Sequence, residues 1–226
     1  MVAEMATANE ILAVARRELG VKESPANSNN VKYNTAYYGQ EVWDGKAGGK
    51  YPWCMVFQWW LFLEAGAPEL FYGGKKTASC YMLMEFARSH GQLVTFDYAP
   101  GDLLFLRFNK KRTTPEHVGI LKEIRANGTF VTIEGNTGLE DDANGGQVQQ
   151  RVRYGWQVLS AYRPHYDKEE ATVDNNPSAS HKEGVEWAVK NGILRGNGSG
   201  DLMLRQNVTR EQLCTMLHRT FELLKK

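Results

Sequence analysis

The chain has 226 residues, of which 42% are hydrophobic, and its 27 Lys and Arg against 26 Asp and Glu leave a net charge of +1. This length suits one domain of ordinary size with a small appendage, and the apolar content is sufficient for a packed core. A nearly neutral chain lacks the basic bias of proteins that bind nucleic acid or anionic membranes, so we expect neither partner. The most apolar run, residues 53–63, is well short of the roughly 20 residues that a membrane-spanning helix needs.

The three cysteines, Cys54, Cys80 and Cys214, are too few and too odd in number for a disulfide framework. This usage predicts synthesis in a reducing compartment. The first ten residues carry two glutamates and no apolar stretch, so we expect no signal peptide.

The first half of the chain has helical periodicity. Thr7 and Glu10 have the spacing of a capping box, and an apolar stripe follows them until Gly20. A long polar stretch comes next, and a loop of that length inside a compact domain is usually functional. The predicted elements are helices over residues 7–19, 54–65 and 77–90, with a loop over residues 21–52.

After residue 100 the apolar residues alternate with polar ones, as they do in strands. Helices followed by an antiparallel sheet predict an α+β fold. The predicted strands cover residues 102–108, 118–124, 129–133, 147–153 and 157–163.

Cys54 is the best candidate nucleophile. It follows a loop rich in Gly and Pro and begins an apolar helix, where unpaired N–H groups favour a thiolate and can hold an oxyanion. Cys80 and Cys214 lie inside amphipathic helices and are interpreted as core cysteines.

Three further polar residues complete a candidate site. His117 stands at the start of an apolar strand, and Glu134 and Asn136 lie in the next strand. In the order Cys, His and acid or amide, these residues supply a nucleophile, a base and an orienting group for acyl transfer.

The register of these two strands is not fixed by the sequence. A two-residue turn at Asn127-Gly128 pairs Leu121 with Glu134. His117 and Glu134 then share a face of the sheet but stand about four residues apart. Contact between them requires a loop centred a residue or two nearer to Arg125-Ala126.

Residues 5–165 resemble the CHAP domain, the cysteine- and histidine-dependent amidohydrolase/peptidase domain of peptidoglycan hydrolases. The resemblance rests on several motifs that occur in order along the chain. They are Glu18-Leu19-Gly20-Val21, Tyr51-Pro52-Trp53-Cys54 with Trp59, Pro100-Gly101-Asp102-Leu103, His117-Val118-Gly119-Ile120 and Ile133-Glu134-Gly135-Asn136.

The resemblance implies a papain-like fold with Cys54 as nucleophile, His117 as general base and Glu134 as orienter. It implies Asn136 as a fourth member of the site. We also expect the neighbouring Tyr51 and Trp53 to bind substrate, a role for which the motif supplies only their position.

No cofactor is expected. Some members of the family bind calcium in an Asp-rich loop before the cysteine, but residues 37–51 contain only Glu41 and Asp44 as acids, so calcium is not supported. The Asp141-Asp142-Ala143-Asn144 segment is interpreted as a solvated loop rather than a cation site. The cysteines are too far from one another and from histidines for zinc-ligand spacing.

Residues 166–181 form a predicted linker, and residues 182–226 resemble a single S-layer homology motif. That resemblance implies binding of a secondary cell-wall polymer, with Thr209, Arg210 and Trp187 as candidate wall-binding residues. The family usually has three copies, so one copy predicts either packing on the catalytic domain or a homo-oligomer formed through this motif.

The combined features predict a phage or prophage endolysin that cleaves an amide bond of peptidoglycan, as an N-acetylmuramoyl-L-alanine amidase or an endopeptidase. Such an enzyme would be made in the host cytoplasm and act on the cell wall after release. One alternative is an NlpC/P60-type cell-wall peptidase, against which the Glu-Gly-Asn motif favours CHAP. The other is a non-catalytic wall-adhesion module, which the intact Cys, His and Glu set disfavours.

Overall fold

The computed structural model describes residues 6–43, 50–139, 141–167, 175–197, 200–206 and 208–225. Asp44 of the predicted loop and residues 168–174 of the predicted linker therefore lie outside the described residues. The chain divides into two compact units, Met1–Lys168 (unit 1) and Glu169–Lys226 (unit 2). None of the helices in the described ranges has the length and apolar character needed to cross a membrane.

Three of the four helices of unit 1 confirm the prediction from periodicity. The capping box is present, since the Thr7 hydroxyl accepts a hydrogen bond from the Glu10 N–H and the Glu10 carboxylate accepts one from the Thr7 N–H. Ser79 caps α4 in a similar way. The helices are α1 (Ala8–Arg17), α2 (Lys32–Tyr38), α3 (Cys54–Glu64) and α4 (Cys80–Ser89).

Helix α2 corrects the prediction of an uninterrupted loop over residues 21–52. It forms because its aromatic side chain Tyr33 is fully buried against α3, with the ring centroid of Tyr33 5.0 Å from that of Phe57 and 5.0 Å from that of Trp60. The Tyr33 hydroxyl also donates to Glu18 at 2.7 Å. These contacts are long-range, so local periodicity could not reveal them.

Six antiparallel strands form one sheet in the order β1-β6-β2-β3-β4-β5. The α+β fold class and five of the strands were predicted, whereas the two-residue β1 was not. The strands are β1 (Leu93–Val94), β2 (Leu103–Leu106), β3 (His117–Ile124), β4 (Phe130–Thr137), β5 (Gln147–Arg153) and β6 (Val158–Tyr162).

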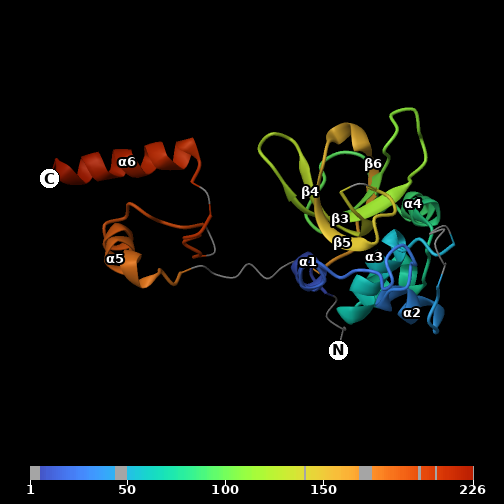
Figure 1. The fold of residues 1–226 in the computed structure, drawn as a ribbon. Coiled ribbons are helices and arrows are strands. Elements are labelled where there is room, and N and C mark those ends of the chain that lie inside the picture. The colour runs from blue at the N-terminus through green and yellow to red at the C-terminus, as the bar shows by residue number, and fades with distance from the viewer. Residues whose placement is uncertain are drawn as a thin grey trace. The chain divides into compact units, whose positions relative to one another are not determined.

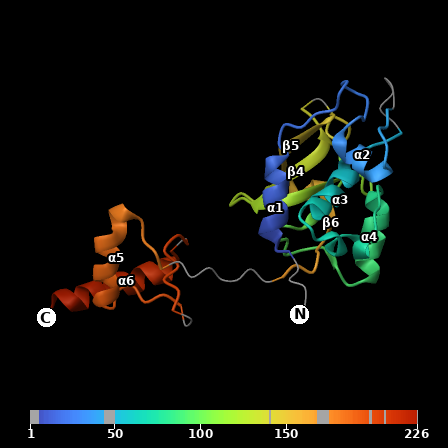
Figure 2. The same ribbon diagram turned by 90° about the horizontal axis from the view of Figure 1, so that it is seen from below.

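Helix α3 is the centre of unit 1. It packs against β3 and β4, and α1 and α2 pack against it in turn, so the helices cover one face of the sheet (Figures 1 and 2). The approach of α3 to β4 is close: a Cβ on Gly135 would lie 2.6 Å from Phe57 and 2.8 Å from Trp53. Only glycine fits at that point of the strand.

The two faces of the sheet have separate cores. Leu103 and Phe105 of β2 belong to the large core under the helices, and Leu104 and Leu106 belong to a smaller cluster with Leu121. This division follows from the pleat, which points successive side chains to opposite faces.

The β3–β4 hairpin differs from the strict two-residue turn. Arg125 N–H donates to Thr129 O and Gly128 N–H donates to Arg125 O, which makes a three-residue loop with Gly128 at φ +78°. A bulge between Leu121 and Glu123 shifts the register once more, so Leu121 pairs with Thr132 instead of Glu134. The strict two-residue pairing was wrong. The register does shift toward the contact of His117 with Glu134, but the loop stays centred on Asn127 and the bulge supplies the second part of the shift.

Unit 2 contains two helices, α5 (Lys182–Lys190) and α6 (Arg210–Leu224), and its described part has almost no core. Helix α6 begins with a capping box, because the Thr209 hydroxyl accepts from the Gln212 N–H and the Gln212 side chain accepts from the Thr209 N–H. Among its described residues, only Ile193 and Asp201 are buried.

Candidate active site

Cys54 is the first residue of α3 and lies buried at its N-terminus. The sequence produces this arrangement because Trp53 adopts a non-helical conformation and ends the preceding loop. At this position the first N–H groups of the helix have no intrahelical partner, and the helix end carries partial positive charge. The geometry favours an anion at the sulfur or at an oxygen bound next to it.

His117 and Glu134 are brought together by the hairpin register. His117 is the first residue of β3, Glu134 lies in β4, and both are fully buried with Nε2 of the imidazole 3.0 Å from Oε2 of the carboxylate. The imidazole N–H is not directed at the oxygen, so the contact is chiefly electrostatic. Gly119 makes room for it, since a Cβ there would lie 2.5 Å from Cγ of Glu134.

The charges of Cys54 and His117 support each other. A hydrogen bond from Cys80 makes the largest contribution in holding the pKa of Cys54 well below its ordinary value, and the positive charge of His117 acts in the same direction against the effect of burial. Burial would lower the pKa of His117, but the Cys54 thiolate and then Glu134 raise it to about 9. The favoured state at neutral pH is a thiolate beside an imidazolium.

Cys80 was interpreted from the sequence as a core cysteine, and the structure gives it a second contact. It is the first residue of α4, packs against the core that contains Cys54, and has its own pKa raised well above the ordinary value by Cys54. Two helix N-termini therefore converge on the candidate nucleophile. Its position one residue after the cap Ser79 was the only signal in the sequence.

Glu134 has more partners than the sequence suggested. Besides His117, the Arg153 guanidinium donates from Nε to Oε1 at 2.8 Å and from Nη2 to Oε2 at 2.5 Å, and the Thr132 hydroxyl donates to Oε1 at 2.5 Å. Burial alone would raise the pKa of Glu134, but Arg153 and then His117 lower it to about 2. The lowered pKa keeps the carboxylate ionised at neutral pH.

The network continues beyond Glu134. The third nitrogen of Arg153, Nη1, lies 2.8 Å from Oδ1 of Asp142, and Arg151 contacts the same oxygen. Asp142 had been interpreted as part of a solvated loop, and its carboxylate is instead about one-third exposed and bound to two arginines. Arg153 could not be predicted because the β4–β5 register decides which face of β5 carries it.

Asn136 lies in the same strand as Glu134 but has different contacts. Its backbone has a φ of +56°, its side-chain amide donates to Asn144 at 3.0 Å, and its oxygen accepts from the Gly146 N–H at 3.3 Å. These bonds hold the loop that joins β4 to β5. The predicted role of Asn136 as a fourth active-site member stays a prediction.

The two candidate substrate-binding residues differ. Trp53 is fully buried, and its Nε1 donates to Glu23 at 2.7 Å, so its side chain is a core element and has no surface to offer a substrate. Tyr51 is half-buried, with its ring 5.2 Å from that of Tyr38. A substrate contact by Tyr51 stays a prediction.

The part of the chain that the structure describes contains no group of three His, Cys, Asp or Glu residues placed to hold a metal ion. Glu41, one of the two acids of the loop before Cys54, accepts a hydrogen bond from Asn30 at 2.5 Å. The other, Asp44, lies outside the described residues.

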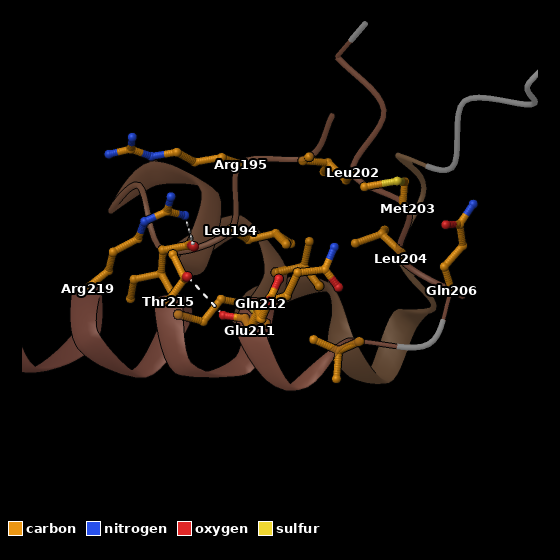
Figure 3. Close-up of a pocket in the computed structure, with 15 residues that line it drawn as sticks. Leu194, Arg195, Leu202, Met203, Leu204, Gln206, Glu211, Gln212, Thr215 and Arg219 are labelled. Carbon is orange, nitrogen blue, oxygen red and sulfur yellow. Dashed lines mark hydrogen bonds between the residues drawn. The ribbon is translucent and has the colours of Figure 1, made fainter. Parts of the chain in front are cut away.

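Unit 2 has a groove of about 580 Å³ lined by residues 193–196, residues 202–204 and α6 (Figure 3). Arg219 donates to the carbonyl of Ile193 at its edge, and Thr215 donates to the carbonyl of Glu211. Trp187, Thr209 and Arg210 are exposed but do not line this groove. Their predicted wall-binding role stays a prediction.

A comparison with protein families covers the residues of this site. Residues 46–136 match the family model of the CHAP domain, a segment that contains Cys54, His117, Glu134 and Asn136. Residues 46–136 therefore resemble a CHAP domain, and the match supports a hydrolase that acts on peptidoglycan.

A solved structure of a wild type endolysin, LysIME-EF1, is 13% identical and aligns with a TM-score of 0.42 over 83% of this chain and 87% of that one. None of the curated proteins matches the chain.

Proposed function

We propose that this protein hydrolyses an amide bond of peptidoglycan with Cys54 as the nucleophile, His117 as the general acid and base, and Glu134 as the orienting group. The observation that carries the proposal is the buried His117–Glu134 contact of 3.0 Å beside a cysteine at a helix N-terminus. The CHAP match over the same residues supports the substrate class.

The proposed reaction has two steps. The Cys54 thiolate attacks the carbonyl carbon of the amide, and the N–H groups at the start of α3 hold the oxyanion. The tetrahedral intermediate collapses as the His117 imidazolium gives its proton to the leaving amine, which leaves a thioester. His117 then takes one proton from a water molecule as the water oxygen attacks the thioester. The intermediate releases the Cys54 thiolate and a carboxylic acid, which loses its remaining proton to the solvent.

The chemistry is the same for an N-acetylmuramoyl-L-alanine amidase and for an endopeptidase that cuts the stem or cross-bridge peptide. Mass spectrometry of digested cell walls separates them, because the amidase leaves an intact glycan and a free L-alanine amine, whereas the endopeptidase leaves a new amine within the peptide. An NlpC/P60-type peptidase is the alternative enzyme, and a wall-adhesion module without activity is the alternative from another class.

We assign the two units separate tasks in this proposal. Unit 1 carries catalysis, and unit 2 serves attachment to a wall polymer or association between chains. Action as an endolysin, made in the host cytoplasm and released onto the wall, fits such a division.

Replacement of Cys54 by Ala or Ser tests the proposal. Loss of the nucleophile should lower the rate of clearing of Gram-positive cell walls by at least about three orders of magnitude, since binding and oxyanion contacts leave only a residual rate. Cys214→Ser is the matched control, because Cys214 is exposed in unit 2, and it should keep full activity. Clearing by the Cys54→Ala protein at the wild-type rate would refute the assignment.

A further inference from the structure

The Glu134 carboxylate is bound by two cations rather than one. Oε2 lies 3.0 Å from Nε2 of His117 and 2.5 Å from Nη2 of Arg153, and Oε1 accepts from Nε of the same guanidinium at 2.8 Å. Arg153 is 2% exposed and contacts the carboxylate through both of its parallel donors. This fork fixes the plane of the carboxylate, which a single imidazole contact does not do.

The catalytic cycle makes the second cation necessary. His117 is an imidazolium when it faces the thiolate and a neutral imidazole after it has given its proton to the leaving amine. A fully buried carboxylate whose only counter-charge is His117 would lose that charge in mid-cycle, and the cost of an unpaired buried charge is several kcal/mol. Such a carboxylate would take up a proton and release the ring.

We propose that Arg153 is a positioning residue that keeps Glu134 ionised and oriented through the whole cycle and that restrains the proton affinity of His117. This inference rests on the proposed function. Arg153 is buried and therefore does not contact the substrate, and its contacts within the site are with Glu134. It therefore acts through Glu134. Without its positive charge, the imidazolium would be over-stabilised by Glu134 and would release its proton to the leaving amine less readily.

Phe108 and Asp142 hold Arg153 in place. The Phe108 ring lies 4.9 Å from the guanidinium carbon and 5.7 Å, centroid to centroid, from the His117 ring, so it covers both cations. Asp142 takes the third guanidinium nitrogen and is itself shared with Arg151. The negative charge of the partly exposed Asp142 therefore offsets part of the positive charge of Arg153 and weakens its electrostatic interaction with Glu134.

The charged groups that face His117 come from several elements. Cys54 lies on α3 with Cys80 of α4 behind it, Glu134 lies on β4, and Arg153 lies on β5. The adjacent Glu116 is engaged elsewhere: its carboxylate pairs with Arg112 at 3.1 Å and accepts from the Phe108 N–H.

The test uses Arg153→Met, which removes the charge, and Arg153→Lys, which keeps the charge but not the fork. The rate of alkylation of Cys54 by iodoacetamide is followed against pH in the full chain carrying Cys80→Ser and Cys214→Ser, so that only one thiol reacts. Serine keeps a hydrogen-bond donor at position 80, and the Arg153 variants are compared with the Arg153 protein in this same background. The upper step of that profile reports deprotonation of His117 without any reference to cell walls. Clearing rates and melting temperatures are measured on the same proteins.

We expect Arg153→Met to raise the upper step by about one pH unit, because a like charge near the imidazolium has been removed. Its clearing rate should fall by on the order of tenfold or more. Arg153→Lys should leave the step in place and recover part of the rate.

Asp142→Asn gives an independent check in a residue that is partly exposed. Loss of its negative charge leaves more of the Arg153 charge to act on Glu134, so the upper step should move to lower pH, opposite to Arg153→Met. If Arg153 only braces the fold, all three variants lower the melting temperature and none moves the step, and the inference is overturned.

The controls separate this inference from the proposed function. If Cys54→Ala cleared walls normally while the alkylation step still shifted as described, the hydrolysis mechanism would be wrong and the role of Arg153 would stand. A fixed step together with loss of clearing by Cys54→Ala would support the hydrolysis mechanism and overturn the role of Arg153.

Discussion

At the scale of single residues, the site depends on where charge is allowed inside a dry interior. Cys54, His117 and Glu134 are each 6% exposed or less, and hydrogen bonds together with neighbouring charges favour the charged form of each. The positive N-terminus of α3 lies at Cys54, at one end of this row of charges, and the Arg153 guanidinium lies at Glu134, at the other end. The sequence predicted these three residues as a site because their types and order are typical of acyl-transfer chemistry, whereas Arg153 carried no local signal.

The pH dependence of activity follows from these charges. The active pair needs a thiolate, which exists above the lowered pKa of Cys54, and an imidazolium, which exists below the pKa of about 9 of His117. The clearing rate should therefore be flat across neutrality and fall as pH rises through about 9. Initial rates in buffers of constant ionic strength measure this limb, and a maximum followed by a fall near pH 7 would contradict the raised pKa of His117.

The free energy of unfolding should fall at both ends of the pH range, because Glu134 loses its contribution in acid and His117 loses its contribution in base. The pKa of Glu134 is lowered from its ordinary value to about 2 on folding, so its contribution is complete above pH 4.5 and is lost as pH falls toward 2. The raised pKa of His117 contributes stability that is complete below pH 6.5 and lost as pH rises through about 9. Urea melts across this pH range measure both limbs, and a Glu134→Gln protein should lose the acid limb.

At the scale of elements, the hairpin of β3 and β4 makes the site. Three predicted helices of unit 1 and five strands were found where periodicity placed them, because burial of an apolar face imposes a period of 3.6 or 2 on any sequence. Register has no such period. It was set by the loop at Gly128 and the bulge after Leu121, two shifts that each move a side chain by one position relative to its partner.

The hairpin register predicts a specific effect at Gly119. A Cβ there would meet Cγ of Glu134 at 2.5 Å and Cβ of Thr132 at 3.1 Å, so Gly119→Ala should push the Glu134 side chain away from His117. We expect the clearing rate to fall by about tenfold or more and the free energy of unfolding to fall by about 1–3 kcal/mol, the usual cost of overpacking. Steady-state clearing and denaturant melts measure the two effects.

Gly155→Ala is the matched control for that change. Gly155 also has a negative φ, and a Cβ there would have no heavy atom within 4 Å. It should leave both quantities close to wild type. Full activity in Gly119→Ala would show that Glu134 does not lie beside Gly119 as the register requires.

At the scale of the whole molecule, the main feature of unit 2 is a row of apolar side chains on α6 that its own residues leave exposed. Helix α6 has one face turned to its own unit, with Met216, Arg219, Thr220 and Leu223 partly buried. An adjoining face carries an apolar stripe of Leu213, Leu217, Phe221 and Leu224, which are 46%, 52%, 65% and 77% exposed. Their spacing of 4, 4 and 3 residues follows one side of a helix and is the pattern that pairs with another helix.

We expect the full chain to self-associate by pairing these stripes from two or more copies. Symmetric association is the commonest way to cover such a face, and two chains held together would bind a repetitive wall polymer with greater avidity. One helix face supplies less than the roughly 800 Å² per partner of a standard interface, so the association should be weak, in the micromolar range. Light scattering at tens of micromolar should give a mass above that of the monomer.

Two full-length variants make this prediction decisive. Leu217→Lys places a charge in the middle of the stripe and should give a monomer, since a buried unpaired ammonium opposes association. Glu222→Lys puts a lysine on another side of α6, with a change of charge of two units instead of one, and should associate as the wild type does. Both should keep the clearing activity of unit 1 on soluble wall fragments, because Cys54 and its partners lie in another unit. A monomeric wild-type chain at tens of micromolar would mean that the stripe of α6 is not covered by a second copy.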